Sequence, residues 1–277
     1  MPPRLVFVPK PCVFCGTRAT LTNAHVLSQA VRAAFSDPSV TGSFVYRQSR
    51  QADGSHAAHS HSGSWVDVKA RAECTRCNSG WTREIEESAS LILPKLIQGQ
   101  QTQLSVQDQQ ALASWSVVTV LLLQHTHSRA AQLVVPASDY AGVFEARSPT
   151  ALMKVFTGYL EPPGRGSRVE ASAEYLAEDR SMADISRLLE SDGLPPPVDM
   201  YAYTATLRLG FWVAHVLRVG SSHFIERVSP AGPALSPCLQ TIWPAQNAVT
   251  WPPRSLAAIG GLMGLARSID NTRVAIV

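Results

Sequence analysis

Apolar positions recur along this chain with two periodicities, and the change between them predicts an α+β fold. Up to about residue 128 the helical periodicity is the stronger one, with apolar side chains every three or four positions over residues 81–96 and 112–122. These stretches predict two helices. The first should end or kink at Pro94, because proline cannot donate the helical hydrogen bond and clashes with the preceding turn.

The predicted helices have suitable residues at their ends. Ser105 is followed three positions later by Asp108, the spacing of a capping box, so the second helix should begin there. His125 and His127 fall where that helix should end, and the negative helix terminus favours such side chains, so we interpret both as structural. A shorter helix is predicted after Ser28, ending near Asp37.

Alternation of period two predicts strands in the rest of the chain. Over residues 21–27 it puts His25 on one face together with Leu21, Asn23 and Leu27. After about residue 130, Gly and Pro separate short apolar runs, which is typical of an antiparallel sheet. The predicted elements are strands at 5–8, 65–72, 201–207, 211–219, 224–228 and 239–243, and a final helix at 255–267. We therefore expect two domains, 1–128 and a β-rich 129–277.

Residues 36–64 carry many Ser, Gly and His residues and few large apolar ones. This composition predicts a long loop or an irregular hairpin. The His-rich tract within it offers possible metal ligands, but an exposed polar loop is the favoured interpretation.

Composition narrows the class of protein. The chain has 277 residues, 45% of them hydrophobic, with a net charge of only +3, so it is no polycation and any nucleic-acid surface must come from local clustering. No secretory signal is evident, since Pro9 and Pro11 interrupt the short apolar start, and no apolar run is long enough for a bilayer. A reducing cytoplasm is the expected compartment.

Four of the five cysteines form two Cys-x-x-Cys pairs, Cys12 with Cys15 and Cys74 with Cys77. Four thiolates are the ligand set of a structural zinc ion, and in a reducing compartment paired motifs hold metal more often than they form disulfides. The alternatives are a redox pair and buried small residues with no ligand role, but a redox motif usually stands alone. The sequence favours zinc, with Cys238 as an ordinary buried thiol.

Three segments together resemble a known family. They are Cys-Val-Phe-Cys-Gly from Cys12, Leu-Thr-Asn-Ala-His-Val-Leu from Leu21, and Cys-Thr-Arg-Cys-Asn-Ser-Gly-Trp from Cys74 with an acidic helix after it. Over residues 12–90 or so this order is similar to the zinc-containing HNH endonucleases of phages and bacteria. The resemblance implies a ββα-metal unit braced by a four-cysteine zinc site.

By that resemblance His25 is the general base and Asn78 helps to hold a catalytic Mg²⁺ or Mn²⁺ ion. The expected reaction is hydrolysis of DNA phosphodiester bonds. The chain departs from the pattern at Ala24, where such families often carry an acidic metal ligand. Asp67 or Glu73 could take its place.

The basic residues Lys69, Arg71, Arg76 and Arg83 cluster around the second pair and could contact DNA phosphates, although solvated surface charge explains each equally well. Structural readings remain open for the two catalytic candidates too, since Asn78 can act as a helix N-cap and His25 as a hydrogen-bonded histidine. Two further functions stay open: a degenerate HNH module that binds nucleic acid or a protein without cutting, and a zinc-ribbon interaction domain.

Overall fold

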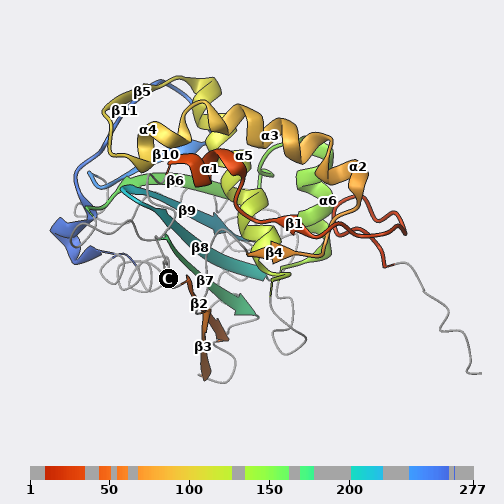
Figure 1. Cartoon of the computed structure of the whole chain (residues 1–277). Coiled ribbons are helices and arrows are strands. Elements are labelled where there is room, and N and C mark those ends of the chain that lie inside the picture. The colour runs from red at the N-terminus through yellow and green to blue at the C-terminus, as the bar shows by residue number, and fades with distance from the viewer. Residues whose placement is uncertain are drawn as a thin grey trace, which may run out of the picture.

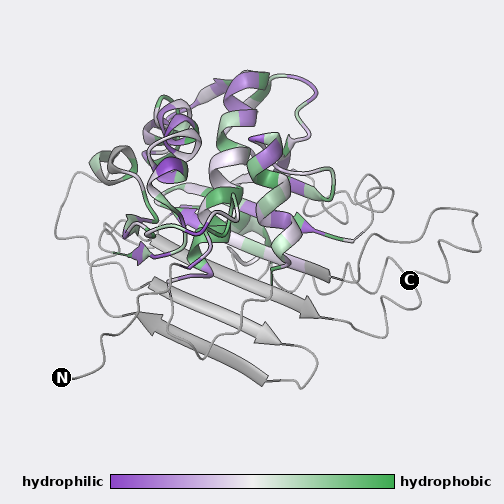
Figure 2. Ribbon diagram, turned by 90° about the vertical axis from the view of Figure 1, so that its right-hand side faces the viewer, coloured by the Kyte–Doolittle hydropathy of each residue, from purple (hydrophilic) through white to green (hydrophobic). Residues whose placement is uncertain are grey.

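The computed structural model describes residues 10–34, 44–50, 55–61, 68–126, 135–161, 169–177, 201–220, 237–261 and 265. Over this part the chain is a mixed α+β protein in which a layer of helices lies on one face of a sheet (Figures 1 and 2). The strands predicted at 5–8 and 224–228 lie outside the described residues, as does His127.

The main sheet has seven strands, all antiparallel to their neighbours except at one junction. In spatial order they are β10 (Leu239–Trp243), β6 (Met153–Tyr159), β9 (Trp212–Arg218), β8 (Tyr201–Leu209), β7 (Val169–Ala177), β2 (Phe44–Arg50) and β3 (Ser55–His61). The exception is the parallel pairing of β2 with β7. Two small antiparallel pairs lie apart from it, β1 (Ala24–His25) with β4 (Lys69–Ala70) and β5 (Thr102–Leu104) with β11 (Val249–Trp251).

Residues 36–64 were expected to form a long loop or an irregular hairpin, and within this stretch the described residues form the hairpin of β2 and β3. The hairpin is regular, and its register runs from Phe44 opposite His61 to Arg50 opposite Ser55. The segment lacks the apolar alternation that reveals a strand locally. Its strand structure follows from pairing with β7, a partner more than a hundred residues away in the chain.

Helices are present where they were predicted in the first half of the chain, whereas α2 (Thr75–Asn78) and α6 (Ala137–Ala146) were not predicted. The predicted ones are α1 (Gln29–Ala34), α3 (Trp81–Ser90), α4 (Leu93–Ile97) and α5 (Val106–Leu123). The break at Pro94 is confirmed, because α3 ends at Ser90 and Pro94 lies in the first turn of α4. The predicted final helix begins as a 3-10 turn, η2 (Leu256–Ile259), and Gly260 then adopts a left-handed conformation.

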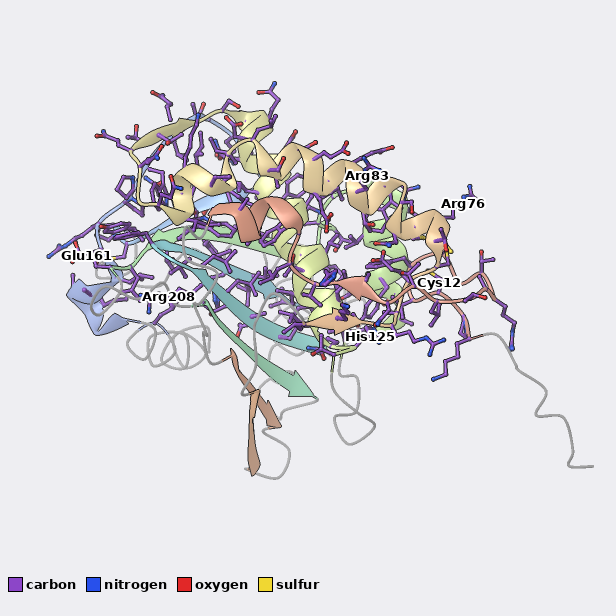
Figure 3. All side chains as sticks on the ribbon, viewed as in Figure 1. Cys12, Arg76, Arg83, His125, Glu161 and Arg208 are labelled. Carbon is purple, nitrogen blue, oxygen red and sulfur yellow. The ribbon has the colours of Figure 1, made fainter. Side chains whose placement is uncertain are left out.

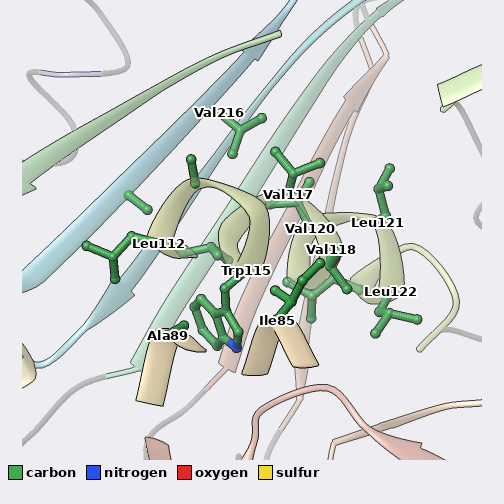
Figure 4. Close-up of a cluster of buried hydrophobic side chains, with 14 of the residues drawn as sticks. Ile85, Ala89, Leu112, Trp115, Val117, Val118, Val120, Leu121, Leu122 and Val216 are labelled. Atoms are coloured by element: carbon green, nitrogen blue, oxygen red, sulfur yellow. The ribbon is translucent and has the colours of Figure 1, made fainter. Parts of the chain in front are cut away.

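Helix α5 lies at the centre of the molecule, between α3 and the sheet (Figure 4). Its start is the predicted capping box: Ser105 Oγ accepts from the Asp108 N–H, and the Asp108 carboxylate accepts from the Ser105 N–H. Helix α5 is buried on both faces, and its apolar residues accordingly lie on all sides of the helix. Even so, no helix in the described part of the chain has the length and apolar character needed to cross a bilayer.

One hydrophobic cluster joins residues from both sides of the predicted boundary at 128, among them Val26, Leu112, Tyr203 and Trp251. A smaller cluster, including Phe156 and Val213, covers the other face of the sheet. The division into 1–128 and 129–277 therefore stays a prediction, and a boundary there would cut through a shared core.

Candidate metal centre

The first Cys-x-x-Cys segment is a tight hairpin turn over residues 10–18, here called the first knuckle. The Cys12 N–H donates to the Thr17 carbonyl and the Gly16 N–H donates to the Cys12 carbonyl, both at 2.9 Å. Gly16 has a φ of +67°, a conformation that costs glycine little and other residues more. The turn brings Cys15 back beside Cys12, with both sulfurs on the same side of the hairpin.

The second segment is a strand end that turns directly into a helix. Cys74 forms an antiparallel bridge with Leu21 and then acts as N-cap of α2, whose last residue is Asn78. Gly80 is required at the junction with α3, because a Cβ there would lie 2.6 Å from the Arg76 carbonyl oxygen. Residues 74–77, here called the second knuckle, are thus a tight turn that is continuous with α2, and α3 begins three residues after α2 ends.

The two segments dock against each other through the backbone. The Val13 N–H donates to the Ala72 carbonyl at 3.0 Å, and the Cys74 N–H donates to the Cys12 sulfur at 3.4 Å. As a result, ligand atoms that are far apart in the sequence meet at one end of the molecule (Figure 3).

The four sulfurs fit a zinc ion. All four Sγ atoms lie within 4.8 Å of one another, with 3.7 Å between Cys12 and Cys77 and 3.8 Å between Cys15 and Cys74. A zinc ion with Zn–S bonds of about 2.3 Å requires a sulfur tetrahedron with edges of about 3.8 Å. No disulfide joins them. The predicted ligand set is therefore brought together as a cluster that can bind zinc.

Burial and hydrogen bonding act in opposite directions on these thiols. Burial raises the pKa of Cys12 and of Cys77. Burial also opposes ionisation of Cys15, but hydrogen bonds from the Thr17 side chain and backbone outweigh it and lower the pKa of Cys15 to about 6. A bound cation would overcome the burial effect, since a thiol that coordinates zinc is deprotonated.

His25 lies on β1, directly opposite Lys69 of β4. Its side chain is half-buried, whereas its neighbours Ala24 and Val26 are buried in the interior. The strand is shorter than the predicted 21–27, but His25 keeps the expected position on a strand beside the segment that enters the second knuckle.

Asn78 is half-buried at the end of α2. Its N–H donates to the Cys74 carbonyl at 3.0 Å, and its own carbonyl accepts from Thr82. The N-cap of α3 is Gly80, so Asn78 does not have the capping role that was one reading of its sequence position.

The predicted phosphate-contacting residues Lys69, Arg71, Arg76 and Arg83 are all exposed. The guanidinium of Arg83 forms an ion pair with the Glu87 carboxylate at 2.7 Å, so its positive charge is already paired. Two exposed basic residues on the first knuckle, Lys10 and Arg18, were not anticipated. In the sequence, these two basic residues flank the first Cys-x-x-Cys pair. Their place beside the other basic residues becomes evident only when the structure shows that the two knuckles dock.

Glu73 is the least expected residue near the cluster. Its side chain is only 2% exposed, and its Oε2 accepts from the Thr82 hydroxyl at 3.3 Å. Burial raises the pKa of Glu73 to about 7. A carboxyl enclosed beneath α3 is not positioned as an open metal ligand in place of an acid at position 24. Asp67, the other candidate, lies outside the described residues.

His125 follows α5 and makes structural contacts, as expected, but its ring is not the cation that the negative helix terminus favours. Its Nε2 lies 3.1 Å from the Tyr140 hydroxyl, and burial lowers the pKa of His125 to about 4, so the ring is neutral at physiological pH.

Comparison of the chain with protein-family models, with curated proteins and with solved structures finds no match. The likeness to HNH endonucleases therefore depends on the quoted motifs, and the four-cysteine cluster depends on the geometry described above.

Proposed function

We propose that this protein is a metal-dependent endonuclease of the HNH type that hydrolyses DNA phosphodiester bonds. One observation carries the proposal. The four-cysteine cluster joins the two knuckles beside the antiparallel pair of β1 and β4, and α3 follows the second knuckle. This arrangement supports the ββα unit that the family resemblance implies, with α1 and the hairpin of β2 and β3 inserted between the two strands. His25 lies on β1, and Asn78 is the last residue of α2.

In this proposal the half-buried His25 imidazole accepts a proton from the water that attacks the phosphorus atom. A histidine suits this role because its ordinary pKa leaves a large neutral fraction near pH 7. Asn78 helps to hold a Mg²⁺ or Mn²⁺ ion, which would supply stabilisation of the charge that develops on the phosphate and the leaving oxygen. The zinc ion is a brace, with all four coordination positions filled by sulfur.

DNA is the proposed partner because exposed basic side chains surround the knuckles. Lys69 and Arg71 extend from the β4 region, Arg76 from α2, and Lys10 and Arg18 from the first knuckle. Such a cluster neutralises backbone phosphates without reading the base sequence.

A second candidate function is a zinc-braced module that binds nucleic acid or a protein partner without hydrolysis. Ala24 favours it, since this side chain is buried and cannot coordinate a metal. The enclosed Glu73 carboxyl favours it too, because it leaves the position of the usual acidic ligand unfilled among the described residues.

Nicking of supercoiled plasmid separates the two functions. We expect the wild-type protein to nick DNA with Mg²⁺ or Mn²⁺ and not with EDTA, and His25→Ala to lose about 10²–10⁴-fold in rate, the usual contribution of a general base. Asn23→Ala, which alters an exposed residue two positions away, is the matched control and should keep the rate. Zinc content should be equal in all three proteins. Full cutting by His25→Ala would remove His25 from the mechanism, and plasmid binding without nicking by the wild type would favour the second candidate.

A further inference from the structure

Helix α6 packs beside both knuckles through aromatic side chains, and Figure 1 shows it at the same end of the molecule as α2. Tyr140 of α6 meets the ring of Phe14, in the first knuckle, at a centroid distance of 5.8 Å. Phe144, one turn later, meets the ring of Trp81 at 5.8 Å. Trp81 is the first residue of α3 and itself packs against Phe14 at 5.0 Å. The second half of the chain therefore reaches the candidate metal centre.

Arg147 directly follows α6, and its side chain lies over two of these rings. The guanidinium carbon lies 4.1 Å from the ring centroid of Phe144 and 5.0 Å from that of Trp81. Arg147 is exposed, whereas Trp81 is buried. Because the face of an aromatic ring attracts a cation, the two rings hold this guanidinium at the surface, close to the second knuckle.

The backbone of Arg147 has a conformation that favours glycine. As the C-cap of α6 it has a φ of 56° and a ψ of 21°, and its N–H donates to the Val143 carbonyl at 2.9 Å. Arg147 is the only residue other than glycine with a positive φ in the described part of the chain. Glycine is the common residue in this left-handed conformation at a helix end, because a Cβ raises its energy. An arginine that ends the helix at this cost points to a function of its side chain.

The N–H donors of the Arg147 side chain are available to a ligand. No hydrogen bond or ion pair joins this guanidinium to another of the described residues, whereas the guanidinium of Arg83 is paired with Glu87. Stacking on the rings uses the face of the planar group and leaves its N–H donors at the edge. These donors match the oxygens of a phosphate group, and two of them can bind one phosphate.

We propose that Arg147 binds a phosphate group of the DNA backbone and extends the basic surface around the knuckles into the second half of the chain. The exposed Arg76 is its neighbour on that surface, because the Arg76 carbonyl lies against Gly80, directly before Trp81. A guanidinium that the rings already hold in place loses less conformational freedom on binding than a free side chain does, which favours the contact. The inference rests on the proposed binding of DNA and does not depend on hydrolysis by His25.

Arg147→Gln tests the proposal in a DNA-binding titration. The probe is a short DNA duplex that carries a fluorophore, and its association constant is measured over a range of NaCl concentrations without added Mg²⁺ or Mn²⁺. Each phosphate contact contributes about 0.9 to the slope of the logarithm of this constant against the logarithm of the salt concentration, so we expect the variant to lose about this amount of slope. Lys95→Gln is the matched control. It removes one positive charge from an exposed residue of α4, which follows the far end of α3 (Figure 1), and should keep the wild-type slope.

Arg147→Gly keeps the proposal testable if the glutamine variant fails to fold, because glycine fits the left-handed conformation and should preserve the end of α6. We expect the same loss of slope in this variant. An unchanged slope in a folded Arg147 variant, or an equal loss in Lys95→Gln, would overturn the phosphate contact of Arg147 and leave the proposed DNA partner standing. A wild-type chain that does not bind the duplex even at low salt would overturn the DNA partner and this contact together.

Discussion

Replacing Cys77 by serine is expected to abolish zinc binding and to unfold the segments that the two knuckles hold together. A structural zinc ion contributes about 10–16 kcal/mol of apparent binding free energy in small zinc domains, and this free energy is coupled to folding. Here the ion would close the long loop of residues 16–73, so its loss should affect both segments at once.

The local structure around the cluster explains why little else can replace the metal. Helix α2 has four residues and no side-chain cap, and β1 and β4 pair over only two residues each. Such short elements are not stable by themselves, because fixing their backbone costs more than their few hydrogen bonds return. The cluster, together with the packing of Phe14 and Trp81, supplies the missing stabilisation.

Metal analysis and thermal unfolding of Cys77→Ser check this expectation, with loss of zinc and an added or much earlier unfolding transition as the predicted result. Cys238→Ser is the matched control. Its thiol is buried in the separate cluster with Phe156 and Leu239, so the variant should keep a full complement of zinc. Stoichiometric zinc and an unchanged transition in Cys77→Ser would contradict the assignment of Cys77 as a ligand.

Replacing Asp139 by alanine is expected to destabilise the fold by about 3–5 kcal/mol, the cost of leaving a buried charge without its partner. Asp139 lies in the first turn of α6 and Arg218 ends β9, and both side chains are almost fully buried. The carboxylate accepts from Arg218 Nε and Nη2, each at 3.0 Å, so the pair is bidentate and ties the helix layer to the sheet.

Denaturant unfolding monitored by tryptophan fluorescence measures this loss. The double variant Asp139→Leu with Arg218→Met is the control, because it removes both charges and keeps apolar volume. It should recover much of the stability lost in the single variant. A loss below about 1 kcal/mol in Asp139→Ala would mean that Arg218 is not dependent on this carboxylate.

The parts of the fold that sequence predicts are those decided by local chemistry. The capping box at Ser105 depends on two side chains and their own backbone, and the break at Pro94 depends on one ring, so both were predicted and are confirmed. Strand β10 has the predicted bounds, Leu239–Trp243, because this short segment lies between Pro237 and Pro244.

The parts that sequence does not predict depend on distant partners. The sequence of the β2 and β3 segment is polar and left a loop and a hairpin both open, and the hairpin becomes evident only from its place beside β7. At the site, the cysteines were predictable because four thiolates have few other uses. The burial of Glu73 was not, since it follows from how α3 packs over the second knuckle, and its sequence neighbours do not indicate it.

The central claim is that Cys12, Cys15, Cys74 and Cys77 surround one zinc ion. X-ray absorption at the zinc edge of the purified protein tests it most directly. We predict one zinc per chain with a single shell of four sulfurs at about 2.3 Å and no nitrogen or oxygen ligand. Protein without zinc, or a shell with fewer than four sulfurs, would contradict the claim.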